Sequence, residues 1–280
     1  MNNNRSYFLI SCMVFGFAFL YVPILSLIIF SFNKSKLVTV WAGFSTKWYG
    51  ALLQNEQILQ AAWISLRIAF VNACFAVALG TLAGFVLARL GRFRGRTLFT
   101  GMVTAPLVMP EVITGLSLLL LFVAMQDLIG WPQGRGITTI TIAHITFSMA
   151  YVAVIVQSRL SSVDESVEEA ALDLGARPAK VFFVITLPII APALVSGWLL
   201  AFTMSLDDLV IASFVSGPGS STLPMVVFSK VRLGVSPEIN ALASIIVLLV
   251  SMGVIAAGYL MHRQQKIRQR DIQFAIAANK

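Results

Sequence analysis

Hydrophobic residues dominate this chain in six long runs, which shorter polar segments separate. A helix needs about 20 mainly apolar residues to cross the hydrocarbon core of a bilayer, which is about 30 Å thick. The runs cover approximately residues 8–32, 66–88, 98–125, 137–157, 189–214 and 241–261. The pattern therefore predicts an all-α integral membrane protein with six transmembrane helices. The first run is longer than the apolar core of a signal peptide, which has about 7–15 residues, so we expect it to remain as an uncleaved span.

The composition supports a membrane protein. Only 11% of the residues are charged, against about 25% in soluble domains, and the mean hydropathy is +0.87. In a soluble protein, a net charge of +8 would suggest a nucleic-acid partner. Here the Lys and Arg residues flank apolar runs, so membrane topology accounts for the charge and no nucleic-acid partner is expected. Cys12 and Cys74 lie inside apolar runs without metal-ligand spacing, so no metal site is expected.

The positions of Lys and Arg predict the orientation of the spans. Six spans place both termini on one side of the membrane. Of the 20 Lys and Arg residues, 13 lie on that side and 7 on the other. Positive residues concentrate in cytoplasmic loops, so we predict that the termini and the segment between the fourth and fifth runs are cytoplasmic.

That segment, residues 164–188, has a helical pattern of its own. Ser162, with Glu165 three residues later, predicts a capping box at the start of a helix. Apolar residues then recur at helical spacing, which predicts one apolar face. The residues of this face are Val167, Ala170, Ala171 and Leu174.

The second half of the segment predicts a corner and another helix. Gly175 stands where a helix commonly ends in a left-handed conformation, and Pro178 suits the first turn of a second helix. Pro188 and Pro192 are expected to break the chain before the fifth run. The small residues at the centre of the apolar face would let another protein approach closely. On pattern alone, an ordinary loop between two membrane helices fits equally well.

A family resemblance separates these two interpretations. Glu169-Ala170-Ala171, Gly175 after three further residues, and Ile185-Thr186-Leu187-Pro188 after nine more resemble the EAA motif of ABC importer permeases. The resemblance covers roughly residues 60–260 and implies a type I ABC importer transmembrane domain. It also implies that the loop 158–188 docks into a cleft of a separate ATPase subunit. The coupling residues would be Glu169, Ala170, Ala171, Gly175, Ile185, Leu187 and Pro188.

The same resemblance suggests how the chain is divided. Residues 1–60 would form the first helix and a periplasmic loop, residues 61–258 the permease core, and residues 259–280 a cytoplasmic tail. Aromatic residues in the first outer loop are typical of an interfacial belt; they are Trp41, Phe44, Trp48 and Tyr49. A short helix is predicted from Leu223 to Leu233. Charged residues near it would meet a binding protein or simply be solvated; they are Lys230, Arg232 and Glu238.

Three carboxylates lie inside the predicted spans. Glu111 follows Pro106 and Pro110, which should kink the third run, and its position predicts a depth near the middle of the membrane. Asp207 and Asp208 fall in the outer third of the fifth run. A charge at the centre of a membrane helix costs about 2.5–3.5 kcal/mol, so these residues need a role. Adjacent helical residues point about 100° apart, so only one of the two aspartates should face a pathway, while the other caps or pairs elsewhere.

Two roles for the acids remain open. They can bond neighbouring helix ends, or they can line a path for a cation, which a buried carboxylate attracts strongly. Aromatic faces would assist ammonium groups; the candidates are Tyr151, Trp198 and Phe202. His144, in the fourth run, is more typical of a helix-to-helix hydrogen bond than of a ligand.

Other classes of membrane protein explain less of the sequence. An intramembrane aspartyl protease needs acids on facing helices, whereas Asp207 and Asp208 are consecutive. An ion-coupled secondary transporter would use intramembrane acids but leaves the segment 164–188 unexplained. A phosphate-binding GxxxxGK[ST] loop is absent from the sequence. ATP and Mg²⁺ would therefore belong to a partner ATPase, and this chain would carry no cofactor and no catalytic residue.

Longer stretches resemble the polyamine branch of the family. KLVTVWAGFSTKWYG, TAPLVMPEVITGLSLLLLF and GWLLAFTMSLDDLVIASFVSGPG carry this resemblance. It implies import of putrescine, or of another cation such as spermidine, through a bacterial inner membrane. The expected partners are a sister permease in a heterodimer, an ATPase dimer, a periplasmic polyamine-binding protein and membrane lipid.

Overall fold

The structure is a computed structural model that describes residues 3–37, 40–234 and 236–253, together with residues 255, 259 and 263. Within these residues the regular elements are helices, and one isolated β-bridge joins Asn33 to Phe44. The predicted all-α class is therefore confirmed. The predicted tail, residues 259–280, lies outside the described residues except at positions 259 and 263.

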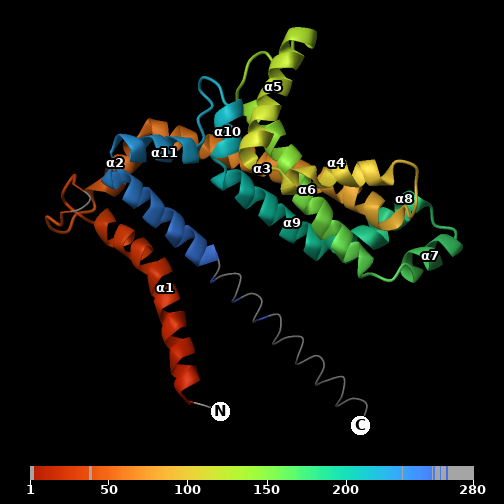
Figure 1. Cartoon of the computed structure of the whole chain (residues 1–280), viewed down its shortest axis with the longest axis horizontal. Helices are drawn as coiled ribbons and strands as arrows, with labels where there is room; N and C mark the ends of the chain where they lie inside the picture. The colour runs from red at the N-terminus through yellow and green to blue at the C-terminus, as the bar shows by residue number, and fades with distance from the viewer. Residues whose placement is uncertain are drawn as a thin grey trace. The chain divides into compact units, whose positions relative to one another are not determined.

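The chain forms two compact units, Gln57–Ser229 and the combination of Met1–Glu56 with Lys230–Lys280. Five helical segments are long and apolar enough to cross a membrane, and a shorter apolar helix, Pro237–Gly253, covers part of the sixth predicted run. The five are α1 (Asn3–Ser31), α3 (Glu56–Arg89), α5 (Glu111–Ile129), α6 (Ile137–Ser161) and the segment Pro178–Asp207 (Figure 1).

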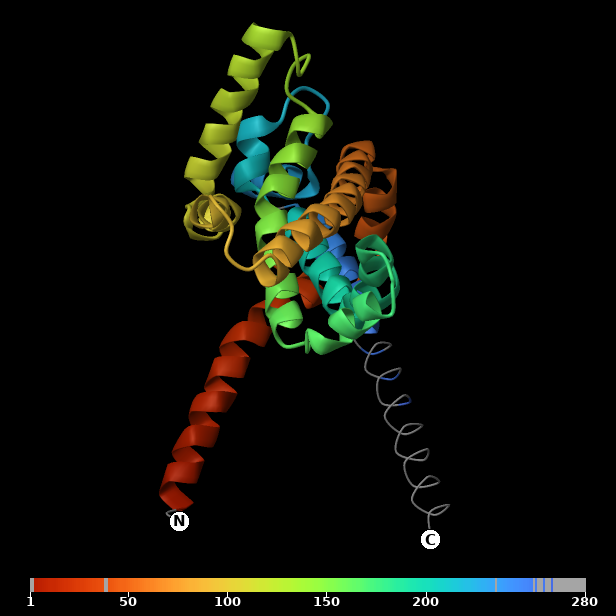
Figure 2. The ribbon, with the colours of Figure 1, turned by 90° about the vertical axis from the view of Figure 1, so that its right-hand side faces the viewer.

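The third predicted run is two helices rather than one kinked helix. α4 (Arg96–Val108) ends before Met109, which is extended, and α5 begins directly after Pro110. Pro110 has no N–H to continue α4 and disfavours a helical conformation at Met109. Pro106 is accommodated inside α4. The chain turns sharply at this break, so that Figure 2 shows α4 end-on and α5 along its length.

The fifth run also differs from its prediction at both ends. Pro188 and Pro192 do not break the chain, because a π-helical turn, Phe182–Thr186, leads directly into α9 (Leu187–Asp207). In that wider turn the Leu187 N–H donates to the carbonyl of Phe182. The helix can therefore continue through Pro188, which has no N–H to donate. α9 then ends at Asp207, and a separate helix, α10 (Val210–Val215), completes the run.

The unit Gln57–Ser229 is built around α3, α6 and α9, which lie side by side (Figures 1 and 2). α3 approaches α6 through glycines one turn apart. A Cβ added to Gly84 would lie 2.7 Å from the carbonyl oxygen of Ala153, and one added to Gly80 would lie 2.7 Å from Val152 Cβ. Small residues at such positions let membrane helices pack closely.

Asn72 connects all three helices through hydrogen bonds. Its side chain on α3 is fully buried, and Nδ2 donates to Ser148 Oγ on α6 at 3.2 Å and to the Ala201 carbonyl on α9 at 2.8 Å. Such bonds hold membrane helices together where water is absent. Sequence analysis did not single out this residue.

The other unit contains α1, α2 (Lys47–Gln54) and Pro237–Gly253. Trp48 does not belong to an interfacial belt as predicted, because its side chain is 8% exposed and its Nε1 donates to the Asn33 carbonyl at 2.7 Å. Trp41 and Phe44 are exposed and remain candidates for the belt. The predicted short helix is confirmed as α11 (Leu223–Leu233).

The close approach of α3 and α6 predicts a sensitive glycine. Gly84→Ala should destabilise the fold by about 1–3 kcal/mol, since a backbone oxygen blocks the added methyl group. Thermal unfolding of the purified chain in detergent measures the effect. Gly101→Ala in α4, where nothing lies within 4 Å of the added atom, is the matched control. Equal melting temperatures for the two variants would contradict this packing.

Candidate functional site

The loop 158–188 contains the predicted helix, corner and second helix. α7 covers Ser166–Asp173, Gly175 has a φ of +86°, and Pro178 opens α8 (Pro178–Val181). A residue with a side chain is strained at such a positive φ, so glycine suits this corner.

The start of α7 differs from the predicted capping box. α6 runs to Ser161, and the hydroxyl of Ser162 donates back to the Arg159 carbonyl at 2.7 Å, so Ser162 ends α6 and does not cap α7. Asp164 instead accepts a bond from the Ser166 N–H at 3.0 Å. The N–H and hydroxyl of Ser166 hold the pKa of the Asp164 carboxyl below its ordinary value.

α7 presents the predicted apolar face without covering it. None of its residues is buried, and Val167 and Leu174 are 46% and 90% exposed. Glu169 and Ala170 are exposed, and Ala171 is half-buried. At the foot of α9, Ile185 and Leu187 are half-buried and Pro188 is exposed. The arrangement leaves α7 available as a docking surface.

A half-buried ion pair holds the loop to the membrane helices, and sequence analysis missed it. Arg89, the last residue of α3, donates from Nε to Glu168 Oε2 at 3.0 Å. Thr186, the last residue of the π-helical turn, donates to Glu168 Oε1 at 3.0 Å. Arg89 is 79 residues from this carboxylate in the chain, so no local sequence pattern could reveal the pair.

The three membrane carboxylates come together at one hollow. Its volume is about 330 Å³, which is within the range of small-molecule sites. α5 supplies Glu111 at its first turn, and the break after α9 supplies the two aspartates. The lining residues are Glu111, Phe147, Met204, Asp207, Asp208, Leu209 and Val210.

The adjacent aspartates have different surroundings. Asp208 is 11% exposed, and its carboxylate accepts three hydrogen bonds, from Ile211 N at 3.2 Å, Ala212 N at 2.7 Å and His144 Nε2 at 3.0 Å. It thus caps α10 and pairs with α6, where the 2%-exposed His144 also lies 2.7 Å from Ser205 through Nδ1. Asp207 is exposed and accepts no side-chain hydrogen bond from the described residues. The expectation that one aspartate caps or pairs is confirmed.

The predicted aromatic residues are divided between two places. Tyr151 packs against Phe147, which lines the hollow, with ring centres 5.3 Å apart. Trp198 and Phe202 do not line it. They stack on each other at 5.1 Å, and Trp198 packs edge-on against Phe70 of α3 at 5.8 Å. Of the three predicted aromatic residues, Tyr151 is therefore the one near the acids, because it contacts Phe147 in the lining of the hollow.

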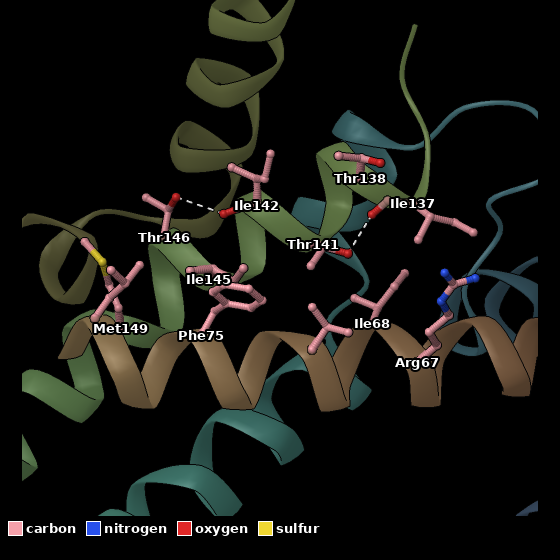
Figure 3. A pocket seen from close by; sticks show the side chains of 12 residues that line it. Arg67, Ile68, Phe75, Ile137, Thr138, Thr141, Ile142, Ile145, Thr146 and Met149 are labelled. Atoms are coloured by element: carbon pink, nitrogen blue, oxygen red, sulfur yellow. Dashed lines mark hydrogen bonds between the residues drawn. The ribbon is translucent and has the colours of Figure 1, made fainter. Parts of the chain in front are cut away.

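A second hollow, of about 560 Å³, lies between α3 and α6 and contains no carboxylate (Figure 3). Arg67 stands at one end and Met149 at the other, with mainly apolar side chains between them. The hydroxyls of Thr141 and Thr146 donate to carbonyls of their own helix. A guanidinium repels cations, so this hollow lacks the chemistry of a cation site.

Comparisons with known proteins agree with the helical architecture. Residues 80–269 match the family described as binding-protein-dependent transport system inner membrane component. The chain is 63% identical to the putrescine transport system permease protein PotI of Escherichia coli strain K12, over 97% of this chain and 96% of that protein. It is 40% identical to the spermidine/putrescine transport system permease protein PotC of the same strain, over 92% and 95%.

Solved structures show the same fold at low sequence identity. A bacterial alginate ABC transporter, in complex with its pentasaccharide-bound periplasmic protein, has a chain with a TM-score of 0.69 at 14% identity, covering 90% of this chain and 91% of that one. A bacterial importer of alginate has a chain with a TM-score of 0.61 at 18% identity, covering 93% and 97%.

The surroundings of the two aspartates predict unequal effects of their substitution on stability. Asp208→Ala should lower the free energy of unfolding by about 1.5–3 kcal/mol, because it removes a helix cap and leaves His144 without its carboxylate. Asp207→Ala is the matched control and should change it little. Thermal unfolding in detergent compares them, and a larger loss for Asp207→Ala would overturn this assignment.

Proposed function

The chain belongs to the family of binding-protein-dependent transport system inner membrane components, and we propose that it carries putrescine through the membrane as the permease subunit of an ATP-driven importer. The observation that carries the proposal is the hollow where Glu111 and Asp207 meet. It lies in a chain that is 63% identical to a putrescine permease along almost its whole length.

The charges of the hollow suit a diamine. Putrescine carries an ammonium group at each end, and a carboxylate attracts such a group electrostatically. Asp208 is committed to α10 and His144, so Asp207 and Glu111 are the carboxylates left for the substrate. Spermidine has the same chemistry, and the 40%-identical relative is named for both polyamines. The higher identity to a putrescine permease favours putrescine.

The exposed face of α7 supports a partner ATPase. Glu169, Ala170 and Ala171 match the EAA motif and belong to a helix that buries none of its residues. The sequence has no phosphate-binding loop, so ATP and Mg²⁺ would be bound by that partner. A sister permease would complete the pathway. A periplasmic polyamine-binding protein would deliver the substrate, as a periplasmic protein binds the related alginate transporter.

The proposed cycle is alternating access. ATP closes the ATPase subunits, and α7 carries that movement into α9, which ends at the acidic hollow. Asp207 and Glu111 hold the diamine between delivery and release. Weak, exchangeable binding serves transport best, which agrees with the exposure of both carboxylates.

The proposed orientation places both termini and α7 in the cytoplasm. The excess of Lys and Arg on that side supports it. Arg89, at the end of α3 that contacts α7, is one of the 13 Lys and Arg residues assigned to the cytoplasmic side, as the positive-inside rule requires. The relatives are permease subunits rather than enzymes, which sets aside the intramembrane protease. The family is that of binding-protein-dependent transport systems, which sets aside the ion-coupled transporter.

Asp207 is expected to be essential for import. Asp207→Asn should lower ATP-dependent uptake of labelled putrescine at least about tenfold, because a charge-assisted hydrogen bond contributes about 1.5–3 kcal/mol and 1.4 kcal/mol is a factor of ten. The measurement uses proteoliposomes with the sister permease, ATPase and binding protein. Asp127→Asn, an acid of α5 outside the hollow, is the control. Normal uptake by Asp207→Asn would exclude this path, and competition with unlabelled spermidine separates the two substrates.

Glu169 is expected to hold the ATPase. Glu169→Lys should abolish copurification of the ATPase subunit, since it reverses a charge at the centre of the exposed docking face. Asp127→Lys makes the same reversal outside α7 and should leave copurification intact. Retention of the ATPase by Glu169→Lys would remove α7 from the docking surface.

A further inference from the structure

Two neighbouring glutamates of α7 have contrasting environments. Glu169 is exposed, whereas the side chain of Glu168 is only 13% exposed. The Glu168 carboxylate receives two bonds from the guanidinium of Arg89, from Nε at 3.0 Å and from Nη2 at 3.3 Å. A third bond comes from the hydroxyl of Thr186 at 3.0 Å. One carboxylate therefore joins α7 to the end of α3 and to the foot of α9.

Arg89 is held as firmly as its partner. Its side chain is 8% exposed, and it also donates to Glu165 at 3.1 Å and to the Val163 carbonyl at 3.4 Å. A planar guanidinium that bonds both oxygens of a carboxylate fixes its direction as well as its distance. The pair is thus built for a defined geometry, unlike an ion pair on an open surface.

Polar contacts attach α7 to the other helices of this unit, whereas apolar packing joins α3, α6 and α9 to one another. α7 buries none of its residues. A movement imposed on its exposed face therefore reaches the helices through the backbone and through polar contacts with Arg89 and Thr186, most of which Glu168 makes.

The bond to Thr186 bypasses the π-helical turn of the backbone. The π-helical turn Phe182–Thr186 lies between α8 and α9, and such turns are less regular than α-helix. Thr186 is the last residue of that turn, directly before α9. From there α9 extends 21 residues, about 30 Å, to Asp207 at the acidic hollow.

We propose that Glu168 is the positioning residue that transmits the movement of α7 to α3 and α9, while the neighbouring Glu169 serves ATPase docking. This inference rests on the proposed function. It assigns different tasks to consecutive glutamates: loss of Glu169 should uncouple the subunits physically, whereas loss of Glu168 should leave them assembled but poorly coupled.

The test compares putrescine import with ATP hydrolysis in the same proteoliposomes of the complete transporter. In Glu168→Gln the amide still accepts a bond from Thr186 but cannot accept both bonds from Arg89. The expected result is normal copurification of the ATPase and continued ATP hydrolysis, with about a fivefold or larger fall in putrescine imported per ATP. Glu165→Gln removes the 61%-exposed partner of the same arginine and should leave this ratio nearly unchanged.

A double-mutant cycle separates transmission from general damage. Arg89→Gln should lower the ratio as Glu168→Gln does, and the double variant should lower it no further, because both remove the same interaction. If these variants assemble poorly, Thr186→Val, which replaces only the hydroxyl by a methyl group, should still lower the ratio.

A wild-type ratio in Glu168→Gln or in an assembled Thr186→Val, or purely additive losses in the cycle, would overturn the proposal. Absence of ATP-dependent putrescine import in the wild-type transporter would instead overturn the proposed function itself. The two failures are therefore distinguishable.

Discussion

The arrangement of the site depends on the hydrogen bonds that the carboxylate of Asp208 accepts. A chain surrounded by hydrocarbon must satisfy its own backbone groups, so a helix can end there only if other groups bond its termini. Asp208 accepts the Ile211 and Ala212 N–H groups of α10 and pairs with His144 of α6. These bonds allow α9 to end at Asp207, whose carboxylate lines the same hollow as Glu111. Asp208 therefore holds the backbone in the conformation that places Asp207 in the hollow.

A comparable polar junction lies at the opposite end of α9. There Glu168 joins α7, α3 and Thr186. α9 thus runs between a junction that faces the proposed ATPase and a hollow that faces the proposed substrate. Between them, Gly80 and Gly84 bring α3 close to α6, and Asn72 bonds both neighbouring helices. The same helix would therefore connect the proposed coupling end of the subunit to the proposed substrate hollow.

Hydropathy alone predicted the helical class and the approximate spans, because a bilayer imposes length and apolarity on a helix. Gly175 and Pro178 were predicted correctly since each has a strong local conformational preference. The break at Met109 follows locally from Pro110, where the sequence predicted a kink instead. The break after Asp207 depends on the bonds that Asp208 makes to α10 and α6. The roles of Arg89 and Trp48 likewise depend on distant partners in the chain. The grouping of Glu111 with Asp207 required the fold.

The most direct test of the central claim is labelling of carboxyl groups in the assembled transporter with a diazo reagent, which forms esters and does not couple amines to carboxylates, followed by mass spectrometry with and without putrescine. Exposed carboxylates react, whereas Asp208, bonded to α10 and His144, should react slowly. The account predicts rapid modification of Asp207 and Glu111 and protection of both by putrescine. Modification of Asp208 as fast as that of Asp207, or labelling of Asp207 that putrescine does not slow, would contradict it.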